Sequence, residues 1–277
     1  MDVEAVIGLE VHAQLATRTK LFCGCPAAFG AAPNVHVCPV CLGLPGALPV
    51  LNEQAVALAL RVAAALGAEV ARRSAFARKN YFYPDLPKNY QITQYEEPLA
   101  ANGRLEVPAP GATRRVRVVR LHLEEDAGKL IHDPAGEGAT LVDLNRAGVP
   151  LLEIVTAPDL RGGAEAQGCL ARLRRTLLYL GACDGGMDEG SLRCDANVSV
   201  RSRGSAELGV KVEVKNVNSL RGLRRAVDFE VGRQARLLAE GGRVVPETRG
   251  WDADAGRTVP MRSKEQAEDY RYFPEPD

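Results

Sequence analysis

The chain has 277 residues, of which 46% are hydrophobic and 25% are charged; this is the composition of an ordinary globular protein with ample length for a core. Acidic and basic residues both number 35, so the net charge is zero and bulk charge gives no support for a nucleic-acid-binding protein. No apolar run reaches the ~18 residues of a membrane span, and the N-terminus is acidic where a signal peptide is basic, so we expect a cytosolic protein with one large domain or two small ones.

Residues 3–14 are predicted to form a strand with two different faces. Alternation places Ile7, Leu9 and Val11 on one face, and Glu10 and His12 on the other. The apolar face must contact the core, so Glu10 and His12 project together from the opposite side. A carboxylate and an imidazole two residues apart can bind a divalent cation. The alternative is a strand face that is simply solvated.

Four of the seven cysteines form two pairs separated by a short loop: Cys23, Cys25, Cys38 and Cys41. Such pairs are typical of a tetrahedral zinc site, and the alternative is four reduced thiols that lie near one another by chance. Four thiolates leave no open position for a reactant, so we predict a structural zinc in an irregular knob at residues 22–42. The remaining cysteines, Cys169, Cys183 and Cys194, are predicted to be small buried side chains.

The rest of the chain combines further strands with three helices. Helices are expected at 53–66, at 164–180, and from a Ser219 cap to the glycines at 241–242. Strands are expected at 114–125, 140–145, 151–155, 192–201 and 209–217, and residues 246–277 form a polar tail without clear periodicity. Strands that neighbour one another in sequence favour an α+β fold with a largely antiparallel sheet. No GxGxxG follows a strand and no GxxxxGK[ST] occurs, so Rossmann and P-loop nucleotide sites are poorly supported.

Acidic residues lie on two predicted strands where a cation would stabilise them. Alternation puts Arg120, His122 and Glu124 on one face, and two more acids follow Glu124 directly. Three successive carboxylates are unfavourable unless a cation neutralises them or water solvates them. Glu153 lies inside the apolar run LLEIV and is expected to be partly buried, hence paired, protonated or bound to a metal. The alternative is a carboxylate that faces a groove or an arginine.

The predicted hairpin at 192–201 and 209–217 places basic and acidic groups on one face. That face carries Arg193, Asp195, Asn197, Lys211, Glu213 and Lys215, while Val210, Val212 and Val214 are predicted to face the core. Surface strands often have this pattern. Combined with Glu10, His12, Glu124 and Glu153, however, the pattern predicts a concave sheet with acids for metals and bases for phosphates, as phosphoryl transfer requires.

Basic residues are also interleaved with aromatic ones. Lys79 and Lys88 lie among Tyr81, Phe82, Tyr83 and Tyr90, and the tail combines Arg249, Arg262 and Arg271 with Trp251, Tyr270 and Tyr272. This pattern suits a nucleotide that stacks and is bound by its phosphates, or else loops that the aromatic rings anchor to the core. The chain has only seven lysines against 28 arginines, so each lysine, Lys20 included, is a candidate for a site that arginine cannot serve.

Together these segments resemble one protein family over essentially the whole chain. VIGLEVHAQL, RKNYFYPDLPKNYQITQYEEPL, LHLEEDAGK, LVDLNRAGVPLLEIV, GSLRCDANVSVR, VEVKNVNS and DYRYFPEPD are similar to the B subunit of the aspartyl/glutamyl-tRNA amidotransferase. The resemblance implies an antiparallel cradle over residues 1–277, related to glutamine synthetase and guanido kinases. The family's C-terminal helical and tail domains are expected to be absent, because the chain ends at Asp277.

The resemblance also implies a reaction, a ligase activity in the cytoplasm. ATP phosphorylates the side-chain carboxylate of Glu-tRNA(Gln) or Asp-tRNA(Asn), and ammonia from the amidase (the A subunit) then displaces the phosphate, while the small C subunit braces the heterotrimer. Two alternatives are a non-catalytic tRNA-binding scaffold that merely holds the amidase, and the related archaeal E-type subunit restricted to Glu-tRNA(Gln). A free-standing zinc-finger module that binds nucleic acid is a further alternative, disfavoured by the zero net charge.

Site roles carry over from the resemblance residue by residue. Magnesium is expected to be bound by Glu10, His12, Glu124 and Glu153, with Glu213 at a second metal position. Phosphates are expected to contact Lys79, Lys88, Lys215 and Arg193, and ATP or metal is expected to be held by Asp195, Asn197 and Asn216. The ammonia path is expected to be lined by Glu125 and Lys129. The zinc is expected to be structural and dispensable to the chemistry.

Overall fold

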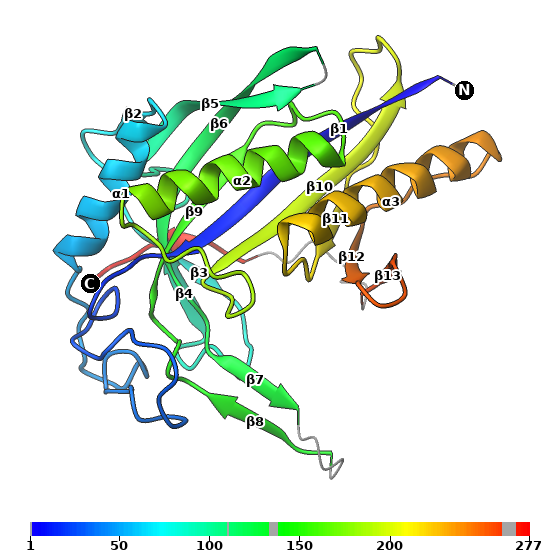
Figure 1. Ribbon diagram of the computed structural model, residues 1–277. Coiled ribbons are helices and arrows are strands. Elements are labelled where there is room, and N and C mark those ends of the chain that lie inside the picture. Colours follow the sequence, from blue (N-terminus) through cyan, green and yellow to red (C-terminus); the bar gives the residue numbers. More distant parts are fainter. Residues whose placement is uncertain (1, 110, 133–137, 262–269) are drawn as a thin grey trace.

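The computed structural model describes residues 2–109, 111–132, 138–261 and 270–277, and one large twisted sheet organises them (Figure 1). Its strands are β1 (Val3–Gln14), β2 (Glu69–Val70), β3 (Ala77–Asn80), β4 (Tyr90–Thr93), β5 (Ala100–Ala109), β6 (Ala112–Glu125), β9 (Pro150–Thr156), β10 (Leu192–Ser202), β11 (Val212–Lys215), β12 (Glu247–Asp252), β13 (Arg257–Pro260) and β14 (Phe273–Pro274). The strand order is β13-β12-β11-β10-β1-β9-β6-β4-β3-β14, with β5 beside β6 and β2 beside β5. Strands β7 (Lys129–His132) and β8 (Thr140–Asp143) form a separate hairpin.

Neighbouring strands are antiparallel throughout the described part of this sheet, except for the parallel pair β11–β12. The prediction of an α+β chain with a largely antiparallel sheet is therefore confirmed. The strands predicted at 3–14, 114–125, 151–155 and 192–201 are present with nearly the predicted bounds. The specific relation to glutamine synthetase and guanido kinases stays a prediction.

The three predicted helices are also present, as α1 (Glu53–Ala65), α2 (Gly163–Tyr179) and α3 (Leu220–Ala239). Ser219 accepts a hydrogen bond from the Gly222 amide and so caps α3 as predicted, and Asn52 caps α1 in the same way. Helices α2 and α3 lie side by side on one face of the sheet, where they cover the apolar side of β1 and β10 (Figure 1). No helix within the described ranges is long and apolar enough to cross a membrane.

Strand β1 shows how one face becomes core and the other becomes available for chemistry. Ile7, Leu9 and Val11 are fully buried beneath the helices, whereas Glu10 and His12 are only partly buried on the opposite face. An antiparallel sheet can be covered on one face alone, so the polar side chains of several strands lie together on the uncovered face. The predicted two-faced strand is therefore confirmed.

Several segments differ from the prediction, among them the short strands β2, β3, β4 and β7, which the sequence did not indicate. Residues predicted as an irregular tail include β12, β13 and β14; these strands have at most six residues, too few for periodicity to show, and β12 is ordered by its parallel pairing with β11. Strand β5, which the sequence did not indicate, carries Gly103 and Pro108, residues that usually mark turns. Val210, predicted to face the core, lies before the start of β11 and is exposed. The predicted tail residue Arg262 lies outside the described residues.

Candidate functional site

A cavity of about 710 Å³ opens on the uncovered face of the sheet. Its walls come from β1, β3, β4, β6, β9, β10, β11 and β12, and from the tail segment that carries Tyr270 and Tyr272. Nine of the residues that the sequence singled out line it: Glu10, His12, Lys79, Glu124, Glu153, Arg193, Asp195, Glu213 and Lys215. Residues up to 205 positions apart in the chain thus meet because the sheet brings their strands together.

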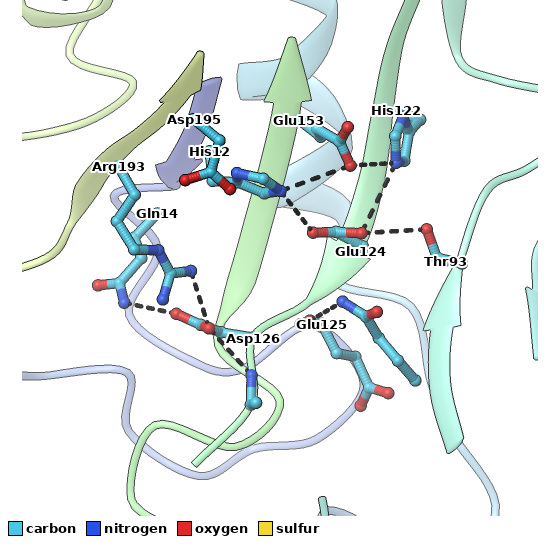
Figure 2. Close-up of polar contacts among 12 residues, drawn as sticks. His12, Gln14, Thr93, His122, Glu124, Glu125, Asp126, Glu153, Arg193 and Asp195 are labelled. Carbon is cyan, nitrogen blue, oxygen red and sulfur yellow. Dashed lines mark hydrogen bonds and ion pairs between the residues drawn. The ribbon is translucent and has the colours of Figure 1, made fainter. Parts of the chain in front are cut away.

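Strand register sets the centre of the cavity. His12 on β1 lies opposite Glu153 on β9, and Glu153 lies opposite His122 on β6, so the three side chains form one row across three strands. The His12 Nε2 atom is 3.5 Å from Glu153 and 3.6 Å from Glu124. The His122 Nε2 atom is 3.0 Å from Glu153 and 3.6 Å from Glu124. Figure 2 shows both imidazoles directed at the two carboxylates, with the Thr93 hydroxyl donating to Glu124.

The electrostatics of this cluster follow from two imidazoles facing two buried carboxylates. Burial lowers the pKa of His122, but its bonds to Glu124 and Glu153 outweigh burial and raise that pKa to about 9. The same balance leaves the pKa of His12 above its ordinary value. Burial raises the pKa of Glu153, yet the two histidines reverse the effect and lower it. The cluster is therefore held together by charge, and a bound cation would take the place of imidazole protons.

His12, Glu124 and Glu153 offer ligand atoms that all lie within 4.8 Å of one another. Two carboxylate oxygens and one imidazole nitrogen fit a divalent cation, with the His122 imidazole behind them within ion-pair distance of both carboxylates. Glu10 lines the same cavity but lies outside this group, since its carboxylate accepts a 2.8 Å bond from the Asn197 side chain.

Cationic groups border the acidic cluster. Lys215 bonds Asp195 at 2.9 Å and Glu213 at 3.2 Å; burial lowers its pKa, but these two carboxylates outweigh burial and raise it. Arg193, opposite His12 in the register, donates to Asp126 at 2.9 Å. Asp126 also accepts a bond from Gln14 (Figure 2). The cavity therefore places positive charge next to the candidate metal ligands.

Aromatic rings form another wall of the cavity. The Lys79 ammonium lies 4.5 Å from the centre of the Tyr270 ring, and Tyr95 stacks on Tyr272 with ring centres 4.0 Å apart. Burial raises the pKa of Tyr272 to about 12, so its hydroxyl stays protonated at neutral pH. The predicted interleaving of lysines and aromatic rings is thus present around Lys79, where flat apolar faces and a cation line the same space.

Five predicted site residues do not line this cavity. Lys88 and Glu125 form a buried ion pair behind it. Lys129 lines a separate cavity of about 250 Å³. Asn197 binds Glu10, as described above, and Asn216 takes a left-handed conformation with φ of 61° at the end of β11.

Sequence reasoning assigned no role to several residues that do line the cavity. His122 and Asp126 are the most closely involved, and Arg120, Gln94 and Thr248 lie beside them. The signal for His122 was present, because alternation put it on the face of Glu124. Asp126 follows the end of β6, so no strand alternation indicated its direction.

The predicted cysteine group is assembled in a second place, on the irregular loops between β1 and α1. The Sγ atoms of Cys23, Cys25, Cys38 and Cys41 all lie within 4.8 Å of one another, which suits a tetrahedral metal site. A hydrogen bond with Cys23 is the main cause that lowers the pKa of Cys41 to about 4. The other three cysteines, Cys169, Cys183 and Cys194, are buried as predicted.

Comparison with known proteins gives a consistent result. Residues 5–277 match the family described as the GatB/GatE catalytic domain. The chain is 60% identical over 276 residues to the B subunit of the aspartyl/glutamyl-tRNA(Asn/Gln) amidotransferase from Anaeromyxobacter sp. strain Fw109-5, and 58% identical over 277 residues to that from Thermodesulfovibrio yellowstonii. All of the chain is covered in both cases, against 57% and 58% of the two relatives. The chain thus spans somewhat more than half the length of these curated relatives.

Proposed function

The chain belongs to the GatB/GatE catalytic domain family, and from this premise we propose that it carries the kinase and transamidase centre of a tRNA-dependent amidotransferase. In this proposal, ATP phosphorylates the side-chain carboxylate of Glu-tRNA(Gln) or Asp-tRNA(Asn) in the cytoplasm. Ammonia released from glutamine by the amidase, or A subunit, then forms the amide, and a small C subunit completes the heterotrimer. The name of the relatives, each a B subunit, supports a complex of several chains.

One observation carries the proposal: a three-ligand cation site and a set of cationic side chains share one cavity. His12, Glu124 and Glu153 would hold the divalent cation, magnesium in our expectation, with Glu10 as a further candidate ligand. When bound, this cation would neutralise charge on the phosphate oxygens. Phosphoryl transfer requires this combination, whereas a scaffold that only holds tRNA does not.

The chain's own residues supply the positioning. Lys215, Arg193 and Lys79 face the cavity and would bind phosphate oxygens, while Asp195 and Glu213 keep the Lys215 ammonium in place. Asn197 and Asn216 stay candidates for holding the nucleotide or its metal. The Tyr81 and Tyr270 rings beside Lys79 offer flat faces for a base. The reaction balances as attack of the carboxylate oxygen on the γ-phosphorus with release of ADP, followed by attack of ammonia on the acyl carbon with release of phosphate.

A route for ammonia is the least direct part of the proposal. Gln14 lines the cavity of about 250 Å³ that also contains Lys129, and it donates to Asp126, which lines the main cavity. Glu125, next to Asp126, is paired with Lys88 behind the same wall. We propose that ammonia passes between the two cavities along this polar wall, with Glu125 and Lys129 on its path.

The test is ADP formation by the chain combined with its amidase and small partner. Glutamylated tRNA(Gln) is compared with uncharged tRNA, for the wild type and for Glu153→Ala. ADP formation that needs the charged tRNA and is lost in the variant is the expected result. Equal activity of the wild type and the variant would overturn the assignment of the cation site, and binding of tRNA without any ADP would favour the scaffold.

A further inference from the structure

Lys20 is a lysine whose side chain is wholly buried, with 0% of its surface exposed. Its ammonium lies 2.7 Å from the His36 carbonyl oxygen, 3.4 Å from the Leu144 carbonyl oxygen and 3.6 Å from the Cys41 sulfur. An ammonium has three N–H donors and no acceptor, and each of these partners can accept. Three acceptors around a buried ammonium offset the cost of removing its charge from water.

The third acceptor belongs to the cysteine group. Cys41 is buried, and its sulfur also accepts a 3.2 Å hydrogen bond from the Cys38 amide. A zinc ion bound by four thiolates carries a net charge of −2, which is unfavourable where water has little access. An ammonium in contact with one thiolate reduces that charge to −1 and directs a lone pair of the sulfur.

The same ammonium connects two separate loops. His36 lies between the two cysteine pairs, and Leu144 follows strand β8. Further bonds join these loops, because Asn145 accepts from the His36 amide at 2.8 Å and donates to the Ala32 carbonyl at 2.7 Å. Lys20 therefore lies where the cysteine-bearing loop meets the loop after β8.

We propose that Lys20 is the outer charge partner of the cysteine metal site, a positioning residue that acts through the Cys41 thiolate to retain the metal. The ligand class is a thiophilic divalent cation, with zinc as the first candidate. Groups behind the ligands typically change metal affinity by about 10–100-fold when they are removed. The inference does not depend on any activity toward tRNA.

The experiment measures zinc content and the rate of zinc release to a chromogenic chelator, for the intact protein purified with its accompanying subunits. Lys20→Met removes the charge and keeps most of the volume, and Lys20→Arg restores a cation. Lys211→Met is the matched control, because Lys211 is an exposed lysine outside the cysteine group. We expect release about 10–100-fold faster in Lys20→Met, partial recovery in Lys20→Arg and no change in the control.

A second measurement separates this role from a merely structural one. If Lys20 only donates hydrogen bonds to the His36 and Leu144 carbonyls, Lys20→Met should destabilise the zinc-loaded and zinc-depleted proteins equally and leave the rate of zinc release unchanged. That result would overturn the proposal. Should Lys20→Met be insoluble, Lys20→Gln and Lys20→Arg replace it, with retention expected in the arginine variant alone. Replacement of zinc by Co²⁺ adds a spectroscopic test: the sulfur-to-cobalt band of Lys20→Met should shift, since one thiolate loses a donor. A wild type that retains no metal at the cysteine group overturns the proposal together with the metal site.

Discussion

The described residues include two groups suited to a metal ion, and these are built in opposite ways. The group of His12, Glu124 and Glu153 lies on three strands, faces a cavity and mixes oxygen with nitrogen ligands. The group of four cysteines lies on irregular loops and uses ligands of one kind. The first leaves room for a reactant beside the cation, whereas four thiolates complete a tetrahedral shell.

Because of this difference, the two groups are expected to depend on different things for their structure. The strand-based group is held in place by the register of a sheet whose core is formed independently, so it should survive without its cation. The loop-based group has little regular structure around it, so the metal itself is expected to order the loop. Loss of ligands should therefore abolish activity at the first group and reduce stability at the second.

The largest effect is expected from Glu153→Gln, which removes the carboxylate that both histidines contact. Phosphoryl transfer should fall by about 10³-fold, or about 4 kcal/mol of transition-state stabilisation, with the fold intact. The measurement is ADP formation with charged tRNA, together with Mn²⁺ binding. Glu10→Gln is the comparison: it lies outside the three-ligand group, so a smaller loss is expected. Equal losses in both variants would make Glu10 a full ligand.

The next largest effect concerns the buried pair of Lys88 and Glu125, which lies behind the cavity. Lys88→Met leaves a buried carboxylate without its cation, and we expect unfolding to be easier by about 3 kcal/mol in urea titrations. Glu125→Gln retains an acceptor for the Ile92 amide, which Glu125 now serves. The double variant should recover most of the loss, and no recovery would show that Lys88 stabilises the fold by other contacts.

A smaller loss of stability is expected from Cys41→Ser. The sheet does not depend on this loop, so we expect the loss of bound zinc, faster proteolysis within residues 22–42 and a destabilisation of about 2 kcal/mol. Circular dichroism and limited proteolysis measure these effects, and Cys169→Ala controls for removal of a thiol. Complete loss of ADP formation in Cys41→Ser would contradict the separation of the two groups.

The smallest effect lies outside both groups, at the pair of Arg117 and Asp159. The hydrogen bond from Arg117 is the main cause that lowers the pKa of Asp159 below 3.8. A lowered pKa means that the pair stabilises the fold above about pH 4 and that this contribution is lost as the pH falls through the folded-state pKa. Asp159→Asn should cost about 0.5–1 kcal/mol at pH 7 and less at pH 3, as urea titrations would measure. An unchanged difference at both pH values would contradict this account.

Residue spacing and the alternation of apolar and polar residues were sufficient to predict much of the fold and part of the candidate site. The cysteine group was predictable because its ligands come from 19 neighbouring positions, and the polar face of β1 because apolar residues alternate along it. The partner of each strand was not predictable, since His12 meets Glu153 through a register that depends on the whole sheet. Lys88 illustrates the limit: the family resemblance implies contact with a phosphate, whereas the side chain pairs with Glu125 and does not line the main cavity, a placement that the sequence did not indicate. For the roles of the site residues, the sequence leaves predictions that only the experiments above can test.

The central place of β1 in the sheet has a consequence for biosynthesis. This strand is made well before β9 and β10, yet it lies between them, and Glu10 pairs opposite Asp195. At about 5–20 residues per second, the ribosome needs roughly 10–40 s to produce the chain between them. Until β9 is made at residues 150–156, β1 has neither of its neighbouring strands, and it lacks β10 until Ser202 has emerged, so the nascent chain is exposed to misfolding and aggregation during this time. His12 is therefore translated long before Glu124 and Glu153, the two residues with which it forms the candidate cation site.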